Sequence, residues 1–225
     1  MGRRWKVDLH CHTWFSPDGL SSPEAIIAAA RRRGLDRLAI TDHDTIAGAL
    51  EARKLAPDLI IVGEEIQTDR GELLAYFVQE EIPPGTSMEE ALAWLRDQGA
   101  VISVSHPLDR YRRGSAVGRE TLLEIISQVD AIEVFNSRCL WPPDNQSAAE
   151  LAQEHGVPGT AGSDAHTAAE VGRAGLILPS FRDAGEFRRS LAEAQVVGKL
   201  SSPGVHAFST YARWRNQLRE RLAWS

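Results

Sequence analysis

The sequence predicts an α/β fold, a closed or partly closed β/α barrel formed by a single domain over residues 1–225. Short apolar runs alternate with amphipathic segments along the whole chain, which is typical of parallel strands connected by helices. Histidines and carboxylates directly follow several of these runs, as expected at the carboxyl ends of barrel strands. No Gly-x-Gly-x-x-Gly follows the first run, which disfavours a doubly wound sheet. No repeat or linker marks a domain boundary.

The composition argues against several classes of protein. Of the 225 residues, 43% are hydrophobic, and the net charge of −6 disfavours an extended nucleic-acid-binding surface. Two cysteines, Cys11 and Cys139, are too few for a disulfide framework. The sequence shows no signal peptide and no apolar run of roughly 20 residues, so we expect a cytoplasmic protein without a membrane span.

The order of elements follows from local signals. Val7 and Leu9 alternate with Asp8 in a short first strand, and Ser22 and Pro23 begin the first helix as N-cap and first helical residue. Later strands are predicted at residues 37–40, 59–62, 73–78, 100–104, 131–135, 157–161 and 174–178. Later helices are predicted at residues 46–55, 88–98, 120–128, 145–155, 184–192 and 208–222.

Metal-binding side chains are expected where the strands end. Alternate residues of an extended chain point the same way, so His10 and His12 can bind one ion, whereas Cys11 points into the core. The carboxyl ends of barrel strands meet on one face. The full set of residues at such ends is His10, His12, His43, Glu65, His106, Asp164 and His166. The two other histidines, His155 and His206, are interpreted as a helix-end residue and a packing or surface residue.

Each of these positions has another explanation when it is taken alone. The acidic residues around His43 would suit a helix N-terminus, and Glu65 would suit a solvated loop. Their common position after strands favours a metal cluster over separate coincidences. The set holds more ligands than one ion needs, and a carboxylate such as Glu65 can bridge two ions. Two-metal sites hold both ends of a phosphoryl displacement and supply hydroxide near neutral pH.

Four motifs in this order resemble those of the PHP (polymerase and histidinol phosphatase) family. They are Asp8-Leu9-His10-Cys11-His12-Thr13, Thr41-Asp42-His43-Asp44, Ser105-His106-Pro107 and Gly162-Ser163-Asp164-Ala165-His166. The resemblance covers nearly the whole chain. It implies a distorted, TIM-like β/α barrel with seven strands of parallel type, and a cluster of two or three divalent ions that hydrolyses phosphoesters.

The resemblance also implies a ligand set. Its members are His10, His12, Glu65 and Asp164 for one ion, Glu65 and His106 for a second, and Asp18, His43 and His166 for a third. Asp18 and Asn136 stand where some family members have histidine; Asn136 would be a weak ligand and would leave the second ion loosely held or absent. Glu72 is interpreted as part of a turn. Histidine and carboxylate ligands admit zinc, manganese or iron.

An arginine-rich loop is expected to bind the substrate. Arg110, Arg112 and Arg113 follow His106, and Arg138 comes after a later strand. Guanidinium groups bind phosphate oxygens in pairs, so these four side chains would hold a phosphate beside the ions. A solvated charged loop is the alternative interpretation.

We therefore predict a metal-dependent hydrolase, in which hydroxide formed at the ions attacks a phosphomonoester or a phosphodiester. Asp42, Asp44 or His166 would transfer the proton, and the sequence does not choose among them. The expected substrate is a small phosphorylated molecule or a short oligonucleotide, with no obligate protein partner inferred; the oligomeric state stays open. The alternatives are an exonuclease acting on short nucleic acids and a catalytically silent, metal-binding regulatory domain.

Overall fold

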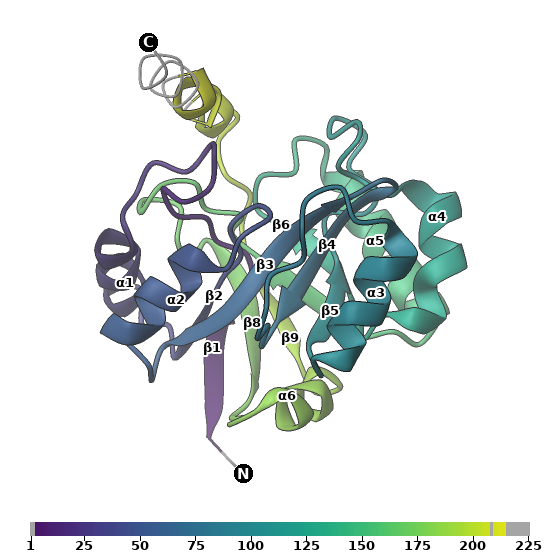
Figure 1. Cartoon of the computed structure of the whole chain (residues 1–225), viewed down its shortest axis with the longest axis horizontal. Coiled ribbons are helices and arrows are strands. Elements are labelled where there is room, and N and C mark those ends of the chain that lie inside the picture. The colour runs from purple at the N-terminus through teal and green to yellow at the C-terminus, as the bar shows by residue number, and fades with distance from the viewer. Residues whose placement is uncertain (1–2, 208, 215–225) are drawn as a thin grey trace.

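The sheet of this protein is rolled into an incomplete barrel with helices around it (Figure 1). The structure, a computed structural model, describes residues 3–207 and 209–214. The strands in these residues are β1 (Arg4–Asp8), β2 (Arg37–Ile40), β3 (Ile60–Thr68), β4 (Gly71–Tyr76), β5 (Val101–Val104), β6 (Ala131–Asn136), β7 (Gly159–Gly162), β8 (Ala174–Pro179) and β9 (Gln195–Gly198). The helices that lie wholly within the described residues are α1 (Pro23–Arg32), α2 (Ala47–Leu55), α3 (Met88–Asp97), α4 (Gly118–Ile125), α5 (Pro142–Glu154) and α6 (Ala184–Leu191), with a 3₁₀ turn at Ile126–Gln128. This confirms the predicted α/β barrel class.

The strand count and strand directions differ from the prediction. The order is β7-β6-β5-β4-β3-β2-β1-β8-β9, which gives nine strands in the described residues, against eight located from local signals and seven implied by the family resemblance. The pairs β3–β4, β4–β5, β1–β8 and β8–β9 are antiparallel, and the others are parallel. A two-residue turn between β3 and β4 reverses the chain without a helix, which only antiparallel strands allow. The short edge strand β9 was not predicted, because it is mostly exposed and its sequence lacks the apolar run of a buried strand.

Two hydrophobic cores lie on the two faces of the sheet. Val7, Leu9 and Tyr76 fill the barrel interior together with Phe187 of α6. Helix α6 lies at the end of the barrel where β1 begins, so it closes that end (Figure 1). The outer core packs the sheet against α1 to α5 and includes Cys11, as predicted. The opposite end of the barrel, where β1 and β2 finish, is left for polar residues.

Helix boundaries follow local signals with small differences. The Ser22 side chain accepts a hydrogen bond from Ala25 N and caps α1, as predicted. Helix α5 begins at Pro142, three residues before the predicted start at residue 145, because proline fits the first helical turn. Residues 205–207 and 209–214 are helical, and the rest of the predicted helix 208–222 lies outside the described residues. None of the described helices is long and apolar enough to span a membrane.

Candidate metal centre

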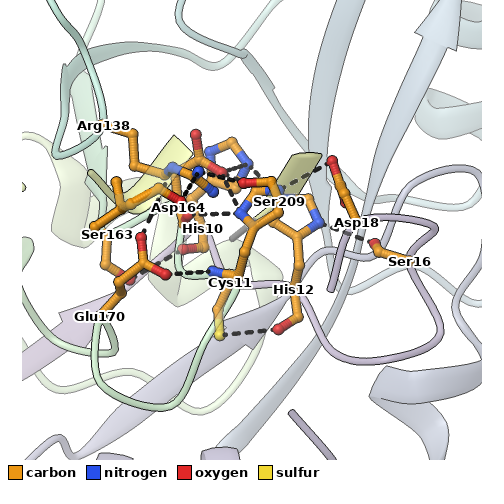
Figure 2. Close-up of polar contacts among 12 residues, drawn as sticks. His10, Cys11, His12, Ser16, Asp18, Arg138, Ser163, Asp164, Glu170 and Ser209 are labelled. Carbon is orange, nitrogen blue, oxygen red and sulfur yellow. Dashed lines mark hydrogen bonds and ion pairs between the residues drawn. The ribbon is translucent and has the colours of Figure 1, made fainter. Parts of the chain in front are cut away.

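Two histidines in the segment after β1 form the middle of the site. His10 Nε2 and His12 Nε2 are 3.1 Å apart, and each lies 3.2 Å from Glu65 Oε2. Asp164 Oδ1, from the loop after β7, lies 3.6 Å from His10 Nε2 and 3.4 Å from His12 Nε2. All four side chains are buried, and Figure 2 shows His10, His12 and Asp164 gathered together. The structure thus brings together the group expected for the first ion.

Glu65 faces a second group with its other oxygen. Glu65 Oε1 lies 3.2 Å from His106 Nε2, and Glu72 Oε2 lies 3.3 Å from the same nitrogen. One oxygen of Glu65 therefore serves each group, as a bridging carboxylate requires. Interpreting Glu72 as part of a turn is wrong, because β4 begins at residue 71 and Glu72 is buried within that strand.

A third group gathers on the far side of His12. Asp18 Oδ2, from the loop between β1 and α1, lies 3.1 Å from His166 Nε2 and 3.6 Å from His43 Nε2. The His12 ring centroid is 4.6 Å from that of His43 and 4.4 Å from that of His166. One ligand atom from each of these four residues lies within 4.8 Å of the others. His12 is thus shared between two groups, which the motifs alone did not indicate.

The backbone at the site is held in uncommon conformations. Asp44, His106 and Asp164 have φ values of 51°, 23° and 51°, in a region that residues other than glycine rarely adopt. A Cβ atom at Gly162 would lie 2.2 Å from His10 Cβ, so this position requires glycine. Such strain persists where surrounding structure holds it, and it gathers at functional sites.

Glu133 of β6 orients the ring of His10 and holds the backbone of His106, and it was not among the residues predicted from the sequence. Its Oε1 lies 3.0 Å from His10 Nδ1, and its Oε2 accepts a hydrogen bond of 2.8 Å from His106 N. A carboxylate on the far nitrogen of a ligating histidine fixes the ring and directs its Nε2 to the metal. The available signal was a glutamate between apolar residues of a strand that is otherwise buried.

Glu133→Gln is expected to weaken metal binding roughly 10- to 100-fold, because an amide holds the His10 ring less firmly than a carboxylate does. Titration of the metal-free protein with manganese or zinc, followed by calorimetry, measures the change. Unchanged affinity in a folded variant would contradict this role for Glu133.

The charges of the cluster shift the pKa values of its members. Burial would lower the pKa of His10 and His43, but neighbouring carboxylates, Glu65 first among them, outweigh it. They raise the pKa of His10 well above its ordinary value and that of His43 to about 10. The same histidines hold the pKa of Glu65 well below its ordinary value despite burial. Burial lowers the pKa of His166 to about 4. The imidazoles and carboxylates in the middle of the cluster therefore stabilise one another's charged forms.

The residues present fit divalent metal ions. Asp18 Oδ1, Asp164 Oδ1 and His106 Nε2 are buried and have no hydrogen-bond partner within the described part of the chain. Buried polar atoms are nearly always satisfied, so such atoms need an explanation, and a bound ion provides one. Mixed imidazole and carboxylate donors suit borderline ions such as zinc, manganese and iron.

Asn136 is placed beside the cluster but does not present its oxygen to it. Its Oδ1 accepts a hydrogen bond of 2.9 Å from Arg138 N, while its Nδ2 donates to Glu133 and to Asp164 Oδ2. The amide nitrogen thus faces the carboxylates. This geometry corrects the expectation that Asn136 is a weak ligand, and it favours a role in positioning Asp164.

Two of the three residues expected to transfer a proton have structural roles. Asp42 is buried, and its two oxygens accept hydrogen bonds from Thr13 N at 2.6 Å and Thr13 Oγ1 at 2.7 Å. Asp44 Oδ1 accepts one from Gln67 N at 2.8 Å. Burial raises the pKa of both carboxylates, and neither side chain lines the pocket that opens beside the cluster. Of the three, His166 alone lines that pocket.

A pocket of about 290 Å³ opens beside the cluster, and three of the four expected arginines line it. Arg112 binds Asp164, Arg113 is exposed at the rim, and Arg138 is buried in the wall. Arg110 is the exception, since its guanidinium pairs with Asp144 of α5 at 2.7 to 3.1 Å. The substrate-binding expectation for Arg110 is thereby corrected.

Two family models match the chain. The model of the PHP domain matches residues 8–133, and the model described as PHP-associated matches residues 142–196. The chain belongs to the PHP domain family. The likeness to solved structures agrees: a two-domain protein from Bacteroides vulgatus, containing a predicted PHP-like metal-dependent phosphoesterase, has the same fold. Its TM-score is 0.72 at 21% identity, over 88% of this chain and 66% of that one.

Other proteins are similar in sequence to parts of this PHP-family chain. An uncharacterized protein of Methanocaldococcus jannaschii is 38% identical over 171 residues, which cover 75% of this chain and 68% of that protein. A 5'-3' exoribonuclease of Haemophilus influenzae is 37% identical over 103 residues, 43% of this chain and 37% of that enzyme. A phosphoribosyl 1,2-cyclic phosphate 1,2-diphosphodiesterase of Eggerthella lenta is 30% identical over 141 residues, 53% of each chain. The match therefore spans about half or less of either enzyme.

Proposed function

We propose that this chain, a PHP-family metal-dependent phosphoesterase, hydrolyses a small phosphomonoester or phosphodiester in the pocket beside the metal centre. The observation that carries this proposal is that proposed metal ligands and arginines line the same pocket. Asp18, His43 and His166 line it together with Arg112 and Arg113. A phosphate in the pocket could therefore contact the guanidinium groups and, at the same time, ions held by these side chains. The volume of about 290 Å³ suits a small molecule or the end of a chain.

Each part of the site then has a chemical role. Divalent ions, when bound, supply a hydroxide nucleophile near neutral pH and neutralise charge on the phosphate. We assign their binding to His10, His12, Asp18, His43, Glu65, Glu72, His106, Asp164 and His166. Arg112 and Arg113 orient the phosphate through paired hydrogen bonds. His166 Nδ1 is 2.9 Å from Asp164 O, which leaves Nε2 for the cluster and favours ligation over proton transfer.

An exonuclease acting on short nucleic acids is the second candidate. Tyr111, which lines the pocket, is 62% exposed. Further exposed aromatic side chains lie on segments that contribute other residues to the pocket lining: Trp141 by 45%, Tyr211 by 54% and Trp214 by 59%. Unpaired bases stack on such rings. One relative is named as an exoribonuclease and another as a diphosphodiesterase, and both names favour a phosphodiester substrate.

The test combines metal content with turnover on one sample. We expect elemental analysis of the purified protein to find two or three divalent ions per chain, and a panel of phosphomonoesters, cyclic phosphodiesters and short oligonucleotides to include a substrate. Chelation should abolish hydrolysis, and added manganese, zinc or iron should restore it.

The preferred ester separates the two candidates. Release of single nucleotides from oligonucleotides favours the exonuclease, and turnover of a small ester alone favours the first proposal. A protein that binds ions but hydrolyses nothing in the panel would instead be the silent regulatory domain. One that binds no ion under any of these conditions would contradict the metal centre itself.

A further inference from the structure

The end of the described chain forms one wall of the pocket. This C-terminal segment, residues 205–207 and 209–214, lies beyond both family-model matches, which end at residues 133 and 196. In Figure 1 it stands at the end of the barrel opposite α6. Its contribution to the pocket lining is His206, Ser209, Thr210 and Arg213. Part of the pocket is therefore built by residues that the family models do not include.

Two arginine contacts attach the segment to the site. Arg213 donates to Asp18 Oδ2 from Nη2 at 2.7 Å and from Nε at 3.2 Å. From the opposite direction, Arg138 Nη2 donates to Val205 O at 3.2 Å and contacts Ser209 Oγ, as Figure 2 shows for Ser209. The Arg213 side chain is 61% exposed, and its guanidinium group makes these contacts.

These contacts place the guanidinium groups where bound ions would compete with them. Asp18 Oδ2, which accepts from Arg213, also faces the imidazoles of the third group. Arg112 likewise binds Asp164, a proposed ligand of the first ion. An ion held by Asp18 Oδ2 would compete with Arg213 for that oxygen, and an ion held by Asp164 Oδ1 would draw negative charge away from the carboxylate whose Oδ2 meets Arg112. Both arginines would thereby lose much of their opposing charge. Arg113 makes no hydrogen bond or ion pair within the described residues.

Little other negative charge remains to balance the arginines of the pocket. Asp109 lies 3.4 Å from Arg112, and Glu170 lies 3.7 Å from Arg138. Arg138 is buried, and its Nε and Nη1 atoms have no hydrogen-bond partner among the described residues. Four guanidinium groups thus face two carboxylates once the ligands bind ions. One phosphate held at the ions cannot satisfy all of these donors.

We propose that the C-terminal segment recognises a second anionic group of the substrate, and that Arg213 binds this group. The inference rests on the proposed function, because it assumes that the phosphate to be hydrolysed sits at the metal centre. The second group is a phosphate or carboxylate within reach of the pocket rim. It belongs either to a small molecule with two anionic groups or to the next phosphodiester of an oligonucleotide.

A binding measurement tests the proposal without turnover. Calorimetry on the full, manganese-loaded chain compares inorganic phosphate with methylenediphosphonate, which carries two linked phosphonate groups and resists hydrolysis. Arg213→Gln should weaken binding of the diphosphonate about 10-fold and leave that of phosphate within about twofold, because one charged hydrogen-bond donor is lost. Arg119→Gln is the matched control, since Arg119 is also 61% exposed and pairs only weakly with Glu154 at 4.0 Å. Equal losses for both probes, or no loss, would overturn the proposal.

Kinetics then distinguish the source of the second group. An aryl phosphate, the same ester with a second phosphate, and a 5'-phosphorylated dinucleotide are compared for the wild type, Arg213→Gln and Arg213→Lys. We expect Arg213→Gln to raise KM about 10-fold for substrates with the second group while kcat is retained, and Arg213→Lys to restore part of the loss. If the wild type hydrolyses none of them, the proposed function fails, and the calorimetric comparison still decides the anion site.

Discussion

Glu65→Gln is expected to lower kcat/KM roughly 10³-fold, about 4 kcal/mol of transition-state stabilisation, and to reduce the metal content of the purified protein. Glu65 presents Oε2 to His10 and His12 and Oε1 to His106. An amide has one oxygen and no charge, so the variant cannot bridge two groups and leaves buried imidazoles without a counter-charge. Elemental analysis and steady-state kinetics on the same preparation measure both effects.

The adjacent Glu64→Gln variant is the matched control for Glu65→Gln. Glu64 is equally buried, but its oxygens accept hydrogen bonds of 3.1 and 3.3 Å from Ile82 N. Burial raises the pKa of Glu64 to about 8, so a neutral amide replaces a side chain that is largely neutral at pH 7. Metal content and activity should stay close to wild type. A Glu65→Gln protein with its full metal content and activity would rule out the bridging role.

Asp8→Ala is expected to lower the free energy of unfolding by about 3 to 5 kcal/mol. Asp8 is buried at the end of β1 and accepts hydrogen bonds from the backbone of Ser163 at 2.9 Å and of Gly172 at 2.8 Å. It also accepts from Ser163 Oγ and from His10 N. Alanine would leave these donors buried and unpaired, and it would loosen the join between β1 and the loop after β7.

Urea denaturation of the metal-free protein measures this loss, because bound ions would add their own stabilisation to the folded state. Asp58→Ala, at an exposed position, is the control and should change stability by less than about 0.5 kcal/mol. A loss below about 1 kcal/mol for Asp8→Ala would show that water or other side chains satisfy the donors.

The residues proposed to bind metal could be predicted from the sequence because the ends of strands can be recognised from local sequence. His10, His12, His43, His106 and His166 each follow an apolar strand, and parallel strands deliver their carboxyl ends to the same side of a barrel. Spacing and alternation were therefore enough to bring them together. The family resemblance added Asp18, which no periodic pattern marks.

Other expectations failed where the direction of a side chain decides the role. Asp42 and His43 are neighbours in one motif, yet Asp42 binds Thr13 while His43 faces the cluster. Arg110 and Arg112 stand two residues apart in one loop, yet Arg110 pairs with Asp144 and Arg112 reaches the site. A loop has no fixed period, so sequence order does not tell which side each residue faces.

By itself, the sequence determined the barrel class, the family and most of the histidines and carboxylates that the structure brings together and that we propose as metal ligands, because these depend on periodic patterns and on motifs at strand ends. Only the tertiary structure decided that Glu72 joins the cluster, that Glu133 orients the His10 ring, and that Arg213 binds Asp18. These contacts join residues far apart in the chain, and in each the partner is set by how strands and segments pack. Local pattern carries no information about such pairings.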